Sequence, residues 1–226
     1  MKKASKYFSD EQKTIIEEAV SRAERNTSGE IVPVIASVSG RYDRAEDVFG
    51  VLFGMLLLTI SWLYTQELTP IVGQWEGEMT TVITLPWALA IIFFGFMLGA
   101  LLASFFPVLR LIFISKKEIQ EDVERSAQQA FHQFRIRGTE GATGVLIYIS
   151  LYEQNVRVLG DEVISAKLKQ EDWDNVCNLV VEGMKSGEPT EKLVEAIEHC
   201  GQLLSNHFPI TDDDQNELPN KLNFID

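Results

Sequence analysis

The chain has 226 residues, and its 33 Asp and Glu residues outnumber its 20 Lys and Arg residues, which gives a formal net charge of −13. Nucleic-acid binding needs a concentrated basic surface, so this balance argues against a nucleic-acid partner. The mean hydropathy of +0.01 conceals two populations. Residues 48–65 and 82–106 carry almost no charge, whereas the rest of the chain is densely charged.

Residues 1–46 predict one helix followed by one strand. The start "MKKASKYFSDEQ" is basic, but no apolar stretch or small-residue cleavage site follows it, so we do not expect a signal peptide there. Ser9, with Gln12 three residues later, is a capping-box pattern that precedes apolar residues at helical spacing. The β-branched stretch "EIVPVIASVS" (residues 30–39) then predicts a strand. One helix and one strand cannot bury a core alone.

Residues 47–107 predict a transmembrane hairpin with helices at about 48–65 and 84–106. At a rise of about 1.5 Å per residue, apolar helices of this length match a hydrocarbon core of about 30 Å. Two buried helices of a soluble protein are the alternative, but helices that are apolar all round would need a very large partner surface. The aromatic residues of an interfacial belt gather around the connecting turn: Trp62, Tyr64, Trp75 and Trp87.

Basic residues set the expected orientation of this hairpin. Arg41 and Arg44 precede the first segment, and Arg110, Lys116 and Lys117 follow the second, whereas the connecting turn has no Lys or Arg. The positive-inside rule therefore keeps both termini in the cytoplasm and exports only the turn. The sequence predicts a multi-pass protein of the bacterial inner (cytoplasmic) membrane, with the lipid bilayer as one partner.

The hairpin is interpreted as an anchor. Neither apolar segment contains Asp, Glu, Lys, Arg or His, so no ion or proton path is expected. Gly50 and Gly54, and likewise Gly95 and Gly99, are small residues four apart, a spacing that lets helix backbones approach closely. Packing within the hairpin and formation of a homodimer are both compatible with this pattern.

Residues 108–209 predict a helix, two strands and two further helices. The segment "SKKEIQEDVERSAQQAFHQF" carries a broad apolar stripe. The segments "VLIYISL" and "NVRVLGD" are joined by a short turn, which predicts an antiparallel pair. Gly187 and Pro189 separate the last two helices. Cys177 and Cys200 lie on the apolar faces of these helices. We therefore expect reduced thiols in the core, in preference to a disulfide or a metal-binding pair. Residues 210–226 predict an acidic tail.

The two charged parts of the chain are expected to form one domain. Each needs the apolar faces of the other, and the orientation places both on the same side of the membrane. The predicted fold class is therefore α/β, a small mixed-sheet α/β sandwich split by an inserted two-helix transmembrane hairpin.

The element order, with "NTSGEIVPV", "GVLIYISLYEQNVRVLGDE" and "NELPN", resembles the TPM-domain family. More narrowly, the chain resembles the branch in which two transmembrane helices are inserted in the domain, and the likeness covers nearly its whole length. The resemblance implies a compact α/β sandwich. Some members of the family are linked to acid-phosphatase activity, calcium binding or assistance to membrane complexes. Many members are exported, whereas the charges of this chain place its domain inside.

Carboxylates at strand ends are the candidate metal ligands. Glu30 begins the first strand, and Asp161 and Glu162 end the last one, so their oxygens could hold Ca²⁺ or Mg²⁺. Arg137 and Thr139, in the loop before the central strand, are candidate contacts for an anion such as phosphate. The alternatives are helix caps and solvated turn charges for the carboxylates, and simple flexibility for the loop "GTEGATG", which does not open a helix.

Other motifs are excluded. The segment "DDDQNELPNKLN" resembles the beginning of an EF-hand loop, but Glu217 stands where glycine is required and Asn223 where glutamate is required. The histidines have no metal spacing, and no nucleophile elbow is present. The leading hypothesis is therefore a membrane-anchored cytoplasmic binding or accessory module that acts on a membrane or cytoplasmic protein. The competing hypothesis is a weak metal-dependent phosphatase.

Overall fold

In a computed structural model of the protein, residues 3–70, 77–81, 83–106, 109, 113–139, 141–210 and 216–226 are described. The chain divides into two compact units, one made of residues 1–40 and 117–226 and the other of residues 41–116. The predicted divisions at 46/47 and 107/108 lie six and nine residues inside the second unit. The predicted tail, residues 210–226, belongs to the first unit.

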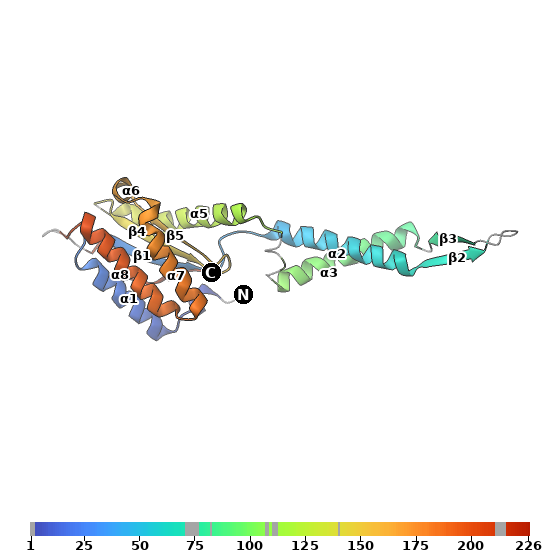
Figure 1. Cartoon of the computed structure of the whole chain (residues 1–226), viewed down its shortest axis with the longest axis horizontal. Coiled ribbons are helices and arrows are strands. Elements are labelled where there is room, and N and C mark those ends of the chain that lie inside the picture. The colour runs from blue at the N-terminus through green and yellow to red at the C-terminus, as the bar shows by residue number, and fades with distance from the viewer. Residues whose placement is uncertain are drawn as a thin grey trace. The chain divides into compact units, whose positions relative to one another are not determined.

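The first unit is built on a four-stranded mixed sheet with the strand order β5-β4-β1-β6 (Figure 1). β1 (Glu30–Ala36) runs parallel to β4 (Gly144–Ser150) along its whole length. β5 (Asn155–Gly160) is antiparallel to β4, and β6 (Asn223–Ile225) is parallel to β1. The two central strands are buried throughout, as their continuous apolar sequences indicate. The predicted mixed sheet and antiparallel pair are confirmed.

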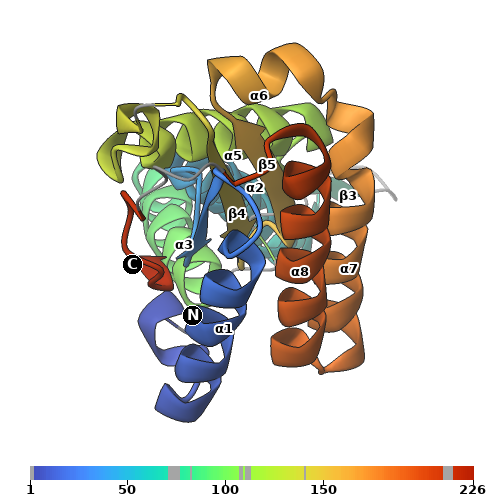
Figure 2. The same ribbon diagram turned by 90° about the vertical axis from the view of Figure 1, so that its left-hand side faces the viewer.

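Helices cover both faces of this sheet (Figure 2). Successive residues of a strand point to opposite faces, so Ile31, Ile35 and Ile147 face one core cluster whereas Val34 and Tyr148 face the other. The first cluster includes α1 (Asp10–Glu24), α7 (Asp174–Ser186) and α8 (Pro189–His207). The second includes α5 (Lys116–Gln133). The unit is thus a sheet between two helical layers.

The predicted helix boundaries hold where local chemistry defines them. Ser9 and Gln12 form the reciprocal capping box at the start of α1. Gly187 ends α7 with φ of 83°, and Pro189 opens α8. A left-handed φ of this kind favours glycine because it has no Cβ.

Two parts of the first unit, around Asp161 and in the C-terminal tail, differ from the prediction. Asp161 and Glu162 were expected at the end of a strand, but Glu162 begins a short helix, α6 (Glu162–Lys167). The end of the predicted acidic tail forms β6 and covers the sheet edge, where Leu222 is buried in the core. A three-residue strand is too short to show the alternation of apolar and polar residues that predicts a strand. Its partner β1 is almost 190 residues away along the chain, so no local turn indicates the pairing. Residues 211–215 of the tail lie outside the described part.

The second unit contains α2 (Asp43–Tyr64) and α3 (Leu85–Phe105), joined through the antiparallel strands β2 (Gln66–Pro70) and β3 (Gly77–Thr81). Two stretches of 21 residues, Arg44–Tyr64 and Leu85–Phe105, are long and apolar enough to cross a membrane. Only 11% and 17% of their most apolar windows are buried, so neither is a core helix within this chain. Trp62, Tyr64 and Trp87 are exposed, whereas Trp75 lies outside the described residues.

Glycines bring α2 and α3 into backbone contact. A Cβ on Gly99 would lie 2.9 Å from the Cα of Gly50, and one on Gly54 would lie 2.9 Å from the carbonyl oxygen of Ile92. Such distances are shorter than van der Waals contact, so a larger side chain would force the helices apart. Of the two uses that the sequence left open for these glycines, the structure shows packing within the hairpin.

Candidate functional site

Two of the predicted carboxylate residues flank one backbone position, Gly144, at the amino edge of β4. The Glu30 N–H donates to the Thr143 carbonyl at 3.1 Å, and the Asp161 N–H donates to the Gly144 carbonyl at 2.9 Å. A Cβ on Gly144 would run into Ile136, so the backbone there passes too close to its neighbour for another residue. The expected alignment of these strand ends is therefore present in the backbone.

The side chain of Asp161 caps α6. Its Oδ1 accepts the Glu162 N–H at 2.8 Å, and the Arg137 Nε lies 4.0 Å from the same oxygen. The side chain is only 3% exposed, and its Oδ2 has no hydrogen-bond partner among the described residues. A buried, unpaired carboxylate oxygen carries a desolvation cost that a donor or a cation would offset.

Arg137, Asp161 and Glu162 line one cavity of about 310 Å³, together with His132. The structure thus brings the predicted anion contact, Arg137, to two of the predicted metal ligands. Thr139 has another role, because it is buried and its hydroxyl accepts the Thr143 N–H at 3.1 Å. That bond orders the loop before β4.

The Glu30 carboxylate belongs to a different cluster. Its Oε1 accepts the Glu217 N–H at 3.0 Å. The nearby Glu24, at the end of α1, accepts the Ile31 N–H through Oε1 at 2.8 Å, and its Oε2 is buried with no hydrogen-bond partner among the described residues. Burial raises the pKa of Glu24 to about 8, and repulsion by Glu30 adds to this rise, while the Ile31 N–H and the nearby Asn220 side chain oppose it.

The Asn216 side-chain amide faces the same cluster. The amide ends in two atoms, one oxygen and one nitrogen, which can exchange places. One of the two places is surrounded by acceptors only: the Glu30 Oε2 at 3.1 Å, the Asn220 Oδ1 at 3.1 Å and the Leu218 carbonyl oxygen at 2.9 Å. An amide nitrogen turned to that position would donate to all three. In that orientation the amide nitrogen satisfies these acceptors and ties the C-terminal segment to Glu30.

Ca²⁺ and Mg²⁺ take carboxylate, amide and carbonyl oxygens, and groups of all three kinds lie around Glu24 and Glu30. Among the described residues, no group of three or more His, Cys, Asp or Glu could hold a metal ion, so any such site would depend on Asn216, Asn220 and the Leu218 carbonyl as well. Sequence reasoning missed Glu24, Asn216 and Asn220. The available signal was "NELPN", whose two asparagines are four residues apart.

Comparison with known proteins bears on the fold. No family model and no curated protein matches the sequence. The NMR structure of the BA42 protein from the psychrophilic bacterium Bizionia argentinensis is similar, with a TM-score of 0.57 and 21% sequence identity over 99% of both chains. At this identity the likeness shows the fold alone. The chain thus has a mixed α/β fold similar to that of a solved bacterial protein.

Proposed function

We propose that this chain is a membrane-anchored member of the TPM-domain family, of the branch with an inserted hairpin. Its α/β domain is a binding or accessory module at the cytoplasmic face of the bacterial inner membrane. Its partners are the lipid bilayer and a membrane or cytoplasmic protein.

The pairing of β1 with β4 carries this proposal. Residues 37–143, which include the whole second unit, separate the two strands in the sequence, yet Glu30–Ala36 pairs residue by residue with Gly144–Ser150. A chain that crosses a bilayer twice returns to the compartment that it left, so two spans are compatible with this pairing and a single span is not. The exposed apolar surfaces of α2 and α3 support membrane insertion.

The distribution of basic residues supports a cytoplasmic domain. Arg41 and Arg44 lie at the beginning of the hairpin and Lys116 and Lys117 at its end, whereas residues 66–81, which include β2 and β3, have no Lys or Arg. Short loops rich in Lys and Arg are retained in the cytoplasm.

Cysteine labelling of whole cells tests this topology. In a Cys177→Ser, Cys200→Ala background, we expect Glu78→Cys to react with a membrane-impermeant maleimide in intact cells. Lys3→Cys and Lys221→Cys should react only after lysis. Termini on opposite sides would contradict the shared sheet, and a reversed pattern would contradict the cytoplasmic assignment.

Photo-crosslinking tests the accessory role. Ile15, Val163 and Ile210 are exposed apolar side chains on the domain, and apolar anchors dominate many protein interfaces. A benzophenone amino acid at one of them should give a discrete crosslinked protein in cells, whereas the same probe at the exposed Glu11 or Glu18 should not. Failure at all three apolar positions would contradict a protein partner on that surface.

A metal-dependent phosphatase is the second candidate, favoured by the cavity that Arg137 and Asp161 share. The guanidinium could bind a phosphate group, and the carboxylate could hold a divalent cation. The purified full chain should then hydrolyse p-nitrophenyl phosphate with Mg²⁺ or Ca²⁺, and Asp161→Asn or Arg137→Gln should lower kcat/KM at least tenfold. Arg125→Gln, an exposed arginine on α5, is the matched control. Activity unchanged by either cavity substitution would remove this candidate.

A further inference from the structure

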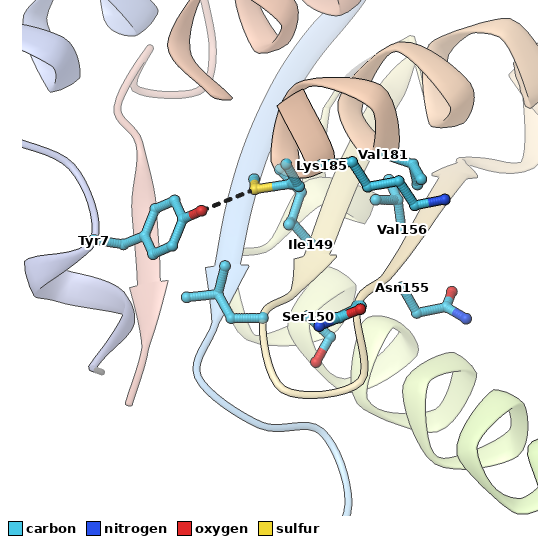
Figure 3. Close-up of a pocket in the computed structure, with 10 residues that line it drawn as sticks. Tyr7, Ile149, Ser150, Asn155, Val156, Val181 and Lys185 are labelled. Carbon is cyan, nitrogen blue, oxygen red and sulfur yellow. Dashed lines mark hydrogen bonds between the residues drawn. The ribbon is translucent and has the colours of Figure 1, made fainter. Parts of the chain in front are cut away.

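A second cavity, of about 370 Å³, lies at the carboxyl end of β4 (Figure 3). The β4–β5 turn, α7 and the N-terminal residue Tyr7 line it. Its volume falls within the range of small-molecule sites, roughly 300–1,000 Å³, and ligands of α/β proteins commonly bind beyond the carboxyl ends of strands. It lies at the opposite end of β4 from Glu30 and Asp161, so it is separate from both clusters described above.

Most of the wall of this cavity is apolar. Ile149 and Val156, from the paired strands β4 and β5, are almost fully buried. Val181 and Met184 on α7, one turn apart, extend the same surface. Figure 3 shows Ile149, Val156 and Val181 together on this side. Such a wall suits the hydrocarbon part of a ligand.

The mouth of the cavity carries an uncompensated cation. Lys185 is exposed and, like several other lysines of the chain, forms no ion pair within the described ranges, whereas Lys13, Lys117 and Lys192 each pair with Asp or Glu. In Figure 3 its ammonium end lies toward Asn155, away from Tyr7. An ammonium and an amide on one side of a pocket can both donate hydrogen bonds to an anionic group. This local positive charge contrasts with the net charge of −13 of the whole chain.

The opposite side is closed by a weak contact. The Tyr7 hydroxyl donates to the Met184 Sδ at 3.4 Å, and a thioether is a weak acceptor. Opening this contact therefore costs little, and Met is adaptable enough to repack around a ligand chain.

We propose that this cavity binds a small amphiphilic anion. The apolar chain lies along Ile149, Val156 and Met184, and a carboxylate or phosphate group meets Lys185 and Asn155. A soluble organic acid and an anionic lipid both present this chemistry.

Methionine-methyl NMR of the full chain in phosphatidylcholine nanodiscs tests the proposal. Met184 lines the cavity, while Met55 and Met97 lie on α2 and α3 and report partition of a probe into the bilayer. Hexanoate should shift the Met184 signal saturably and bind at least tenfold more tightly than hexanol or hexylammonium. A Met184 signal that moves no more than those of Met55 and Met97, or equal binding of all three probes, would overturn the proposal.

Substitution of the lysine separates a specific site from general attraction. Lys185→Gln should weaken hexanoate at least tenfold and leave hexanol unchanged. Lys221→Gln, an exposed lysine outside the cavity, should leave both unchanged, and equal effects of the two substitutions would overturn the proposal. An unchanged urea midpoint of the α/β domain will show that the variant is folded.

Nanodiscs that contain phosphatidylglycerol distinguish the two sources. A lipid ligand should shift Met184 before any hexanoate is added and should compete with it. A soluble acid should bind with the same affinity in both kinds of nanodisc.

Discussion

A Cβ placed on Gly95 would lie 2.8 Å from the Cα of Gly54. Two non-bonded carbons do not approach so closely, so the α2 and α3 backbones are in direct contact at this level. Without a hydrophobic effect to drive helices together inside a bilayer, such close packing is a main source of their association.

Gly95→Leu should therefore separate the two helices. We expect the distance between spin labels at residues 63 and 87 to lengthen and its distribution to broaden, with a packing loss of about 1–3 kcal/mol. Leu98→Phe, which adds volume at an exposed position on α3, should leave the distribution unchanged. An identical response of the two variants would show that the glycine contact does not hold the hairpin together.

Glu24 should make the stability of the domain depend on pH. Its pKa is about 8 in the folded domain, against an ordinary value of 4.5, so the stabilisation is complete below about pH 4.5 and is lost as the pH rises through 8. The loss is a few kcal/mol at most, since one pKa unit corresponds to about 1.36 kcal/mol. Urea unfolding at pH 5, 7 and 9 should show this slope, and Glu24→Gln should flatten it. Glu18→Gln, exposed on α1, is the matched control and should keep the slope.

A divalent cation should reverse that slope. The cation replaces the proton on Glu24, so its affinity rises with pH. At pH 9 we expect millimolar Ca²⁺ or Mg²⁺ to raise the urea midpoint of the wild-type chain, and Glu24→Gln and Asn216→Ala to reduce that gain. No cation-dependent change at any pH would contradict a site in the Glu24 and Glu30 cluster.

Glu153 should stabilise the point at which the chain leaves the sheet toward α2. Its Oε1 accepts the N–H groups of Ser39 and Gly40 at 2.9 and 3.0 Å, and its Oε2 accepts the Ser150 hydroxyl. Glu153→Ala leaves the partly buried N–H groups of Ser39 and Gly40 and the buried Ser150 hydroxyl without their acceptor, which should cost about 2–4 kcal/mol in urea unfolding of the domain. Glu171→Ala, an exposed glutamate before α7, should cost less than about 0.5 kcal/mol. A similar small loss in both would mean that solvent replaces the carboxylate.

The two cysteines should differ in reactivity. Cys200 is fully buried and Cys177 partly so, and burial raises the pKa of both thiols. Because the thiolate is the reactive form, iodoacetamide at neutral pH should modify Cys177 slowly and Cys200 only after unfolding in urea. Mass spectrometry of the alkylated peptides measures both rates, and equal rates in the native protein would contradict the packing around α8.

Several features follow from the sequence because they depend on neighbours within a few residues. The capping box of Ser9 and Gln12, the turn at Gly187 and the two apolar helices of the hairpin are all set by short-range chemistry or by segment length. The antiparallel pairing of β4 and β5 is equally local, because the strands are separated by a short turn. The mixed α/β fold class follows from the order of these elements.

The tertiary structure decided which side chains meet. The sequence predicted that Glu30 and Asp161 lie at aligned strand ends, but their carboxylates have different partners. The Asp161 side chain caps α6, whereas the Glu30 side chain binds the C-terminal segment. The cluster of Glu24, Glu30 and Asn216 depends on β6 pairing beside β1, a contact between the two ends of the chain. Local periodicity carries no information about such a contact, because it forms only when the core that both ends share is closed.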